Sequence, residues 1–198
     1  MHRLGNVLAA CAIVSSGCAT DRYASTGTAY LNPFAGSWDN VSFWDGDEVV
    51  GQSSIKIDLV HQRVYFYKGD QLVGVSVVST GREGYDTPSG EFRITQKDVD
   101  RASNLYGDYV DPSGHVVMRN VNIKLDPDPQ PPGTTFRGAP MPYFLRIQGG
   151  IGMHAGYLPG YPASHGCIRL PERRAVRFFQ NAACRYSCSG TPVEIIKS

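Results

Sequence analysis

The alternation of apolar and polar residues that begins at Ser53 constrains the fold of this chain most. Between residues 55 and 59, Ile and Leu alternate with Lys and Asp, which is the period of a strand with one buried face. Val-Tyr-Phe-Tyr at 64–67 and a valine-rich run at 72–80 follow, each after a short polar turn. The segment therefore predicts three consecutive strands and a fold built mainly from β-structure.

Later segments extend this pattern. We expect strands at 91–95, 141–148 and 193–196, and shorter ones at 116–118 and 121–125. The chain has 22 glycines and 13 prolines, and only 19% of its residues are charged. That composition favours a domain of strands and turns over a helical bundle.

One helix is expected after Pro171, which suits the first turn of a helix. An apolar stripe then lies opposite a group of arginines, and it consists of Ala175, Val176, Phe179, Ala182 and Ala183. We expect this helix to end near Cys184. Residues 98–140 are less regular, and no role is assigned to them. Their proline-rich part at 126–133 predicts an extended loop, which could serve as a lid.

The first residues of the chain predict export. A basic start at 1–3 and an apolar run at 4–14 precede Ser-Ser-Gly-Cys at 15–18. This arrangement resembles a bacterial lipoprotein signal in which Cys18 is lipidated, and an ordinary cleaved secretory signal or a short membrane anchor is the alternative. The two residues after Cys18 carry no acidic signal of the kind that retains lipoproteins at the inner membrane. We therefore expect the protein on the periplasmic side of the envelope, anchored to the outer membrane.

Residues 154–171, HAGYLPGYPASHGCIRLP, bring two histidines and a cysteine into one short stretch that is rich in Gly and Pro and is typical of an ordered loop. A thiol attacks poorly until an imidazole takes its proton, so these residues are the raw material of a cysteine nucleophile. His154 follows a predicted strand, whose rigid support favours it as the general base. His165 lies two residues from Cys167, beside the thiol.

The remaining cysteines bear on this interpretation. Cysteines of exported proteins are usually paired. Cys184 and Cys188 can pair with each other near the end of the predicted helix, which would leave Cys167 free. An unpaired thiol beside histidines is more often catalytic than structural.

Ser-His-Gly-Cys at 164–167, followed by Ile-Arg-Leu, resembles the signature of the L,D-transpeptidase (YkuD-type) catalytic domain, a family that remodels bacterial peptidoglycan. Ser-Thr-Gly at 79–81, Thr-Pro-Ser-Gly at 87–90 and Met-Pro-Tyr at 141–143 also resemble this family, and the likeness covers residues 53–196. It implies a mainly β fold, a β-sandwich or barrel with one helix after the catalytic cysteine loop.

The resemblance and the composition together divide the chain into three parts. We expect a signal peptide at 1–17, a linker or N-terminal extension at 18–50 and the L,D-transpeptidase catalytic domain at 51–198. Because the extension is rich in aromatic residues, part of 30–50 is expected to pack on the domain. The net charge of +1 argues against a nucleic-acid partner.

The resemblance also implies roles for individual residues. Cys167 would be the nucleophile and His154 the general base, and the N–H groups of Gly166 and Cys167, helped by His165, would stabilise the oxyanion. Gly166 suits this place because backbone near a reacting carbonyl has no room for a side chain, and because glycine accepts a positive φ. Ala155 follows the base where some members have serine, so we expect a backbone carbonyl to orient the imidazole.

Three further residues are candidates for substrate binding. Arg169 fits a carboxylate, which a guanidinium holds through two hydrogen bonds, and a structural salt bridge is the alternative. Ser164 either contacts substrate or hydrogen-bonds within its own loop. By resemblance, Tyr143 belongs to a strand that lines the donor side of the pocket.

The activity that the resemblance implies is a peptidoglycan L,D-transpeptidase, which forms an acyl-enzyme on tetrapeptide stems without a cofactor. The acceptor would be an amine of another stem or a lysine of a wall-attached lipoprotein. If water accepts the acyl group, the same residues make an L,D-carboxypeptidase. In a different class, His154, His165 and Cys167 could bind zinc in a wall protein without transferase activity, although no fourth ligand is evident.

Overall fold

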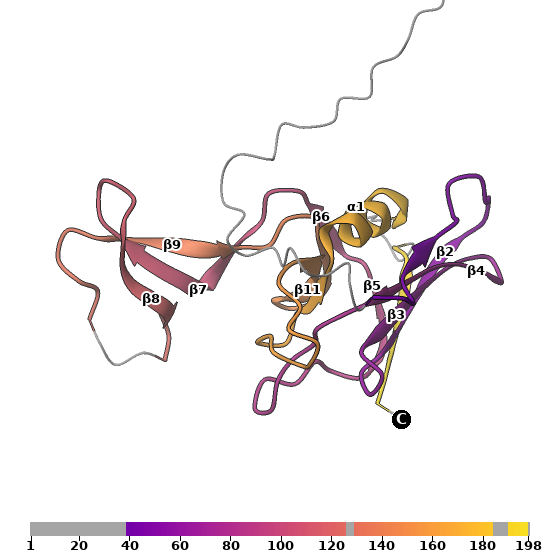
Figure 1. Cartoon of the computed structure of the whole chain (residues 1–198), viewed down its shortest axis with the longest axis horizontal. Helices are drawn as coiled ribbons and strands as arrows, with labels where there is room; N and C mark the ends of the chain where they lie inside the picture. The colour runs from indigo at the N-terminus through magenta and orange to yellow at the C-terminus, as the bar shows by residue number, and fades with distance from the viewer. Residues whose placement is uncertain (1–38, 126–128, 184–189, 198) are drawn as a thin grey trace, which may run out of the picture.

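The computed structural model describes residues 39–125, 129–183 and 190–197, and β-strands dominate it (Figure 1). The elements in chain order are β1 (Phe43–Trp44), β2 (Ser53–Asp58), β3 (Arg63–Lys68), β4 (Gln71–Val77), β5 (Gly90–Arg93), β6 (Gln96–Asp98), β7 (Ala102–Val110), β8 (Val116–Asn122), β9 (Thr135–Pro140), β10 (Phe144–Gln148), β11 (Ile151–Ala155), β12 (Ile168–Leu170), α1 (Glu172–Asn181) and β13 (Pro192–Ile196). The expectation of a mainly β fold with a helix after the cysteine loop is confirmed.

The three strands predicted between residues 53 and 80 form the centre of a six-stranded sheet. Its order is β1-β4-β3-β2-β13-β5, with β3 antiparallel to both β2 and β4 and β13 parallel to β2. Alternate residues of β2 and β3 are fully buried, among them Ile57, Val64 and Phe66. The period-two pattern therefore predicted the inner face of this sheet correctly.

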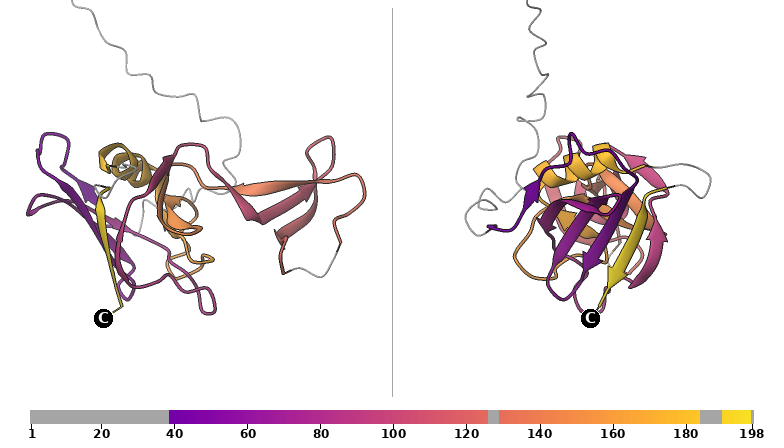
Figure 2. Two further views of the ribbon diagram at one scale, coloured as in Figure 1. Left: turned by 180° about the vertical axis from the view of Figure 1, so that it is seen from behind. Right: turned by 90° about the vertical axis from the view of Figure 1, so that its right-hand side faces the viewer.

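A second sheet, of order β12-β11-β10-β6, lies beside the first (Figures 1 and 2). β11 is antiparallel to β10 and parallel to β12. One face of this sheet enters the core through fully buried side chains, namely Leu145, Met153, Ile168 and Leu170. The opposite face carries the candidate site.

Helix α1 packs against β10 and β11 and joins the core. Its buried residues are Ala175, Phe178 and Ala182, at the i, i+3 and i+7 spacing of one helical face. The predicted stripe was therefore displaced by part of a turn, because Phe178 and not Phe179 occupies the centre of the core face. The Phe179 ring lies at the edge of this face, where its centroid is 5.9 Å from that of Tyr143.

Residues 39–50 pack on the domain, as expected for part of the N-terminal extension. β1 pairs antiparallel with β4, and the Trp44 ring lies 5.4 Å from Phe66 and 5.8 Å from Phe178. Gly74 makes room for the indole, because a Cβ at Gly74 would lie 2.6 Å from a ring atom of Trp44. The ordered domain thus begins before residue 51.

The region 98–140 forms a three-stranded antiparallel sheet of order β8-β7-β9, which extends away from the two main sheets (Figures 1 and 2). We call it the insert sheet. The sequence did not predict β7 or β9, and β8 is one strand where two were expected. The backbones of β7 and β9 approach so closely that a Cβ at Gly138 would lie 1.9 Å from the Ser103 carbonyl oxygen.

Several predictions lie outside the described residues. These are the signal at 1–17, lipidation of Cys18, pairing of Cys184 with Cys188, and part of the loop at 126–133. Within the described ranges, no helix is both long and apolar enough to span a bilayer.

Candidate active site

The predicted base and nucleophile come from neighbouring strands. His154 on β11 is in register with Arg169 on β12, so the two side chains lie on the same face of the sheet. Cys167 lies two residues before Arg169, and the Gly152 N–H of β11 bonds to its sulfur. The flanking residues Met153 and Ile168 point into the core. The fold therefore brings His154, Cys167 and Arg169 to one surface.

The loop that precedes Cys167 is held by the segments at 79–81 and 87–90. Ser79 and Arg169 exchange two backbone hydrogen bonds, of 3.0 and 2.9 Å. The Thr80 carbonyl accepts from the N–H groups of Ala163 and Ser164, each at 3.0 Å. The buried Thr87 hydroxyl donates to the Gly166 carbonyl at 2.8 Å and accepts from the Gly81 N–H at 2.9 Å. The sequence shows both motifs, at 79–81 and 87–90, but it does not show that they support the loop before Cys167.

The turn at Gly166 determines which groups can stabilise an oxyanion. Gly166 has a φ of 105°, as predicted for a glycine here. Its N–H donates to the Ser164 hydroxyl at 3.1 Å, and that hydroxyl donates in turn to the Cys167 carbonyl. Ser164 is fully buried, so its contacts support the interpretation that it closes the loop. Because the Gly166 N–H is engaged by Ser164, the Cys167 N–H is the better candidate for an oxyanion donor.

Cys167 is a free, half-buried thiol whose Sγ lies 3.7 Å from the Gly150 carbonyl oxygen. Burial raises the pKa of this thiol above its ordinary 9.0. The Gly152 N–H and the positive charges of three arginines oppose that rise, and they are Arg169, Arg101 and Arg146. The thiol is therefore protonated at neutral pH and needs a base.

His154 is buried and well placed to be that base. Its Nδ1 lies 2.8 Å from the Ala155 carbonyl oxygen, which only accepts, so Nδ1 carries the proton and Nε2 has a free lone pair. Burial lowers the pKa of His154 from 6.5 to about 4, and the nearby Arg169 charge adds to this effect. The imidazole is neutral at physiological pH, and a backbone carbonyl orients it as expected.

His165 has different surroundings. Its Nε2 lies 2.9 Å from a guanidinium nitrogen of Arg82, its ring stacks on Tyr106 at 4.1 Å, and Tyr85 meets it edge-on at 4.6 Å. Burial, followed by the charges of Arg82 and Arg169, lowers the pKa of His165 to about 4. Since Arg82 can only donate, the His165 proton lies on Nδ1. His165 is thus a neutral donor, consistent with assistance at an oxyanion.

The other predicted substrate contacts differ from one another. None of the six ion pairs found among the described residues involves Arg169, so the salt-bridge alternative has no carboxylate partner there. Tyr143 has a φ of 58°, and its ring lies near Phe179 of α1. The substrate role of Tyr143 stays a prediction.

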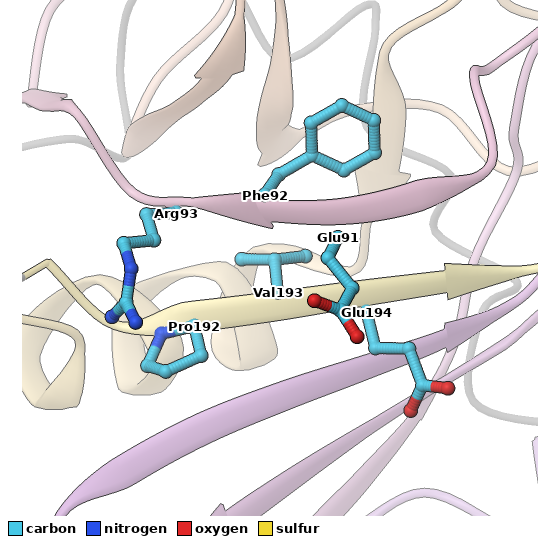
Figure 3. A pocket seen from close by; sticks show the side chains of 6 residues that line it. All are labelled: Glu91, Phe92, Arg93, Pro192, Val193 and Glu194. Atoms are coloured by element: carbon cyan, nitrogen blue, oxygen red, sulfur yellow. The ribbon is translucent and has the colours of Figure 1, made fainter.

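A shallow pocket of about 550 Å³ lies elsewhere, on the outer side of β5 and β13 (Figure 3). Glu91 and Glu194 are paired across these strands, and Lys56 lies 3.3 Å from Glu194. None of the predicted catalytic residues lines it. The described residues also contain no group of three or more His, Cys, Asp or Glu side chains that could hold a metal ion. The zinc alternative therefore lacks a ligand set in this part of the chain.

Comparison with known proteins agrees with this fold. The model of the YkuD L,D-transpeptidase catalytic domain matches residues 52–195, and the chain therefore belongs to this family. The family assignment that the sequence suggested is confirmed. None of the curated proteins matches the sequence significantly.

Solved structures share the fold at low sequence identity. An L,D-transpeptidase from Mycobacterium smegmatis has a TM-score of 0.52 and 14% identity, over 74% of this chain and 59% of that one. One from Stackebrandtia nassauensis has a TM-score of 0.51 and 18% identity, over 82% and 62%. The "Ldtfm-avibactam carbamoyl enzyme" has a TM-score of 0.51 and 21% identity, over 75% and 50%. The present chain thus matches less than two thirds of the length of each of these three solved proteins.

Proposed function

We propose that this protein transfers the acyl group of peptidoglycan tetrapeptide stems through a thioester on Cys167. The observation that carries the proposal is the placement of His154 and Cys167 on one face of the β11–β12 pair. The histidine presents its unprotonated Nε2, and the thiol is the free cysteine of the described residues. Family membership supports peptidoglycan stems as the substrate class.

In the acylation step, the Cys167 sulfur attacks the carbonyl that joins the diacid residue to the terminal D-amino acid. His154 Nε2 takes the thiol proton as the bond forms, and a neutral imidazole can do this without prior ionisation. The Cys167 N–H and His165 Nδ1–H donate to the oxyanion. His154 then returns its proton to the leaving nitrogen, the C–N bond breaks, and the D-amino acid departs.

The second step consumes the thioester. An amine of a second stem attacks the carbonyl, His154 takes a proton from the amine, and the thiol leaves and recovers that proton. A lysine of a wall-attached lipoprotein would react in the same way. With water as the nucleophile the product is a tripeptide, and the protein acts as an L,D-carboxypeptidase. The choice of acceptor depends on the pocket around the thioester and not on the catalytic pair.

The test is incubation of the full chain with purified tetrapeptide muropeptides, followed by mass spectrometry, with Cys167→Ala as the control. Cross-linked dimers that require Cys167 would support the transpeptidase. Tripeptides alone would favour the hydrolase or a missing protein acceptor. A Cys167→Ala variant that keeps turnover would overturn the assignment.

We further propose that the protein works on the periplasmic side of the envelope as a lipoprotein. The proposal rests on the sequence around Cys18, and the disulfide between Cys184 and Cys188 likewise stays a prediction from the sequence. Metabolic labelling with a tagged fatty acid tests it, since Cys18→Ser would abolish labelling and Cys11→Ser would not. Labelling that survives Cys18→Ser would contradict it.

A further inference from the structure

Two arginines from different elements lie over the same aromatic ring beside the thiol. The guanidinium carbon of Arg101, which precedes β7, is 5.3 Å from the centroid of the Phe144 ring, and that of Arg146 on β10 is 5.5 Å from it. Arg146 is in register with Gly152, whose N–H contacts the Cys167 sulfur. The charges of both arginines act on that sulfur. We call Arg101 and Arg146 the arginine pair.

The Phe144 ring contacts the arginine pair and lies outside the main hydrophobic cluster. It is fully buried, yet it is not part of the main hydrophobic cluster, and its ring lies 6.4 Å from His154. A Cβ at Gly152 would lie 2.6 Å from the Phe144 ring, so the glycine lets this ring lie flat across β11. An aromatic face under two guanidinium groups favours both cations and limits their freedom to move.

The arginine pair has no anionic partner within the described ranges. None of the six ion pairs found there includes Arg101 or Arg146. Arg146 Nε donates to the neutral Gln96 side chain at 2.7 Å. Arg101 Nε is buried and has no hydrogen-bond partner among the described residues. A buried, unused guanidinium donor is costly, and an incoming acceptor would remove that cost.

We propose that the arginine pair binds a free carboxylate of the donor peptide and so selects donors that carry one. This rests on the proposed function. A planar guanidinium matches a carboxylate through two parallel hydrogen bonds, and two such groups beside the nucleophile can hold the anion next to the scissile bond. A tetrapeptide donor offers two carboxylates there, the free one of the diacid residue and that of the terminal D-amino acid.

The proposal also gives the insert sheet a function. Arg101 lies at the entry to β7, and Tyr106 on β7 stacks on His165. The Arg101 carbonyl accepts from the Met141 N–H at 2.7 Å, which closes the base of the insert sheet where the chain returns to β10. The insert sheet thereby supplies one half of the arginine pair and one wall of the His165 site.

The experiment compares three synthetic donors: the tetrapeptide with both carboxylates free, the same peptide with the diacid carboxylate amidated, and the same peptide with the C-terminal carboxylate amidated. The full chain, Arg101→Gln and Arg146→Gln are assayed for thioester formation on Cys167. Arg119→Gln is the matched control, because Arg119 is an exposed arginine on the insert sheet.

We expect one amidation to lower kcat/KM of the wild type roughly 10- to 100-fold. With the fully free tetrapeptide, Arg101→Gln and Arg146→Gln should lower kcat/KM by a similar factor. With the amidated peptide that slows the wild type, the same variants should lower kcat/KM little further. That peptide identifies the carboxylate that the arginine pair binds. Arg119→Gln matches the wild type. Variants that slow all three donors equally, or a wild type indifferent to both amidations, would overturn the proposal.

Binding to Cys167→Ala, measured by calorimetry, separates this inference from the proposed function. If Cys167→Ala binds the free acid more tightly than an amide, and Cys167→Ala/Arg101→Gln loses this preference, the arginine pair is supported even if no thioester forms. Equal binding of all three peptides contradicts it even if acylation proceeds. The melting temperature of each variant shows whether the fold is retained. Arg101→Lys keeps the charge without the planar guanidinium and should recover part of the preference for the free acid over the amide.

Discussion

A guanidinium nitrogen of Arg82 lies 2.9 Å from Nε2 of His165, and this contact decides which ring nitrogen of His165 can act. Arginine has donors only, so Nε2 accepts and the ring proton lies on Nδ1. Arg82 lies over the Tyr85 ring at 4.4 Å, and Tyr106 stacks on the His165 imidazole. His165 is thereby fixed as a donor, and the role of base is left to His154.

The first prediction concerns this contact. Arg82→Gln removes a positive charge but keeps a donor, so the pKa of His165 should rise from about 4 toward its ordinary value, although burial still lowers it. NMR titration of the ring protons measures the change, with Arg119→Gln as the control. An unchanged His165 titration would show that Arg82 does not act on it.

The second prediction concerns the pH dependence of the thiol. Burial raises the pKa of Cys167, so its alkylation by iodoacetamide should keep accelerating through pH 9 instead of reaching a plateau near neutrality. Arg169→Gln removes a charge that favours the thiolate and should move the profile to still higher pH. A plateau below pH 7 would indicate a preformed thiolate–imidazolium pair and would contradict the general-base step.

Much of the fold and the catalytic centre could be predicted because the signals were local. Alternating residues at 53–59 reflect a sheet with one buried face, and the His154 and Cys167 motifs lie in one stretch of sequence. The expectation that a backbone carbonyl orients His154 also followed from local reasoning, since Ala155 has no hydroxyl, and the structure shows that the Ala155 carbonyl does so. The structure agrees with each of these.

The rest depends on contacts between distant segments. Neither β7 nor β9 alternates apolar and polar residues, so periodicity does not mark them, and they form because the two backbones can approach closely. Arg101 and Arg146 are far apart in sequence and meet only over Phe144. Thr87 belongs to a motif that resembles the family, but its bond to Gly166 spans 79 residues and no local pattern encodes it.

The third prediction concerns that bond. Thr87→Val replaces the hydroxyl with a methyl group of similar size and leaves the Gly166 carbonyl and the Gly81 N–H without their buried partner. We expect the free energy of unfolding to fall by about 1–3 kcal/mol, and acylation to slow more than stability alone explains, because the nucleophile loop loosens. Urea unfolding and single-turnover acylation measure the two effects.

Thr87→Ser is the matched control for this change, since it keeps the hydroxyl and should retain most of the stability and rate. Exposed Thr95→Val tests the general effect of the same substitution at a site away from the loop. If Thr87→Val equals the wild type in acylation rate, the bond to Gly166 does not position Cys167.

The fourth prediction concerns acid stability. The pKa of His154 is about 4 in the folded protein and 6.5 in an exposed chain, so the unfolded state binds more protons between these values. The stabilisation is complete above pH 6.5 and is lost as the pH falls toward 4, by a total on the order of 3 kcal/mol from His154. His165 acts in the same direction, whereas the lowered pKa of Asp58 acts at more acidic pH.

Urea unfolding of the wild type and His154→Gln at pH 7, 5.5 and 4.5 measures this effect. The free energy of unfolding should fall more for the wild type than for His154→Gln over this range, because glutamine does not titrate. The difference in free energy of unfolding between the two proteins should therefore be smallest at the lowest pH. His61→Gln is the matched control, since His61 is exposed on a turn and lies 2.8 Å from the Asp58 carboxylate, outside the site. Equal losses in the wild type and His154→Gln would mean that folding does not lower the pKa of His154, and would contradict the effect of burial on this base.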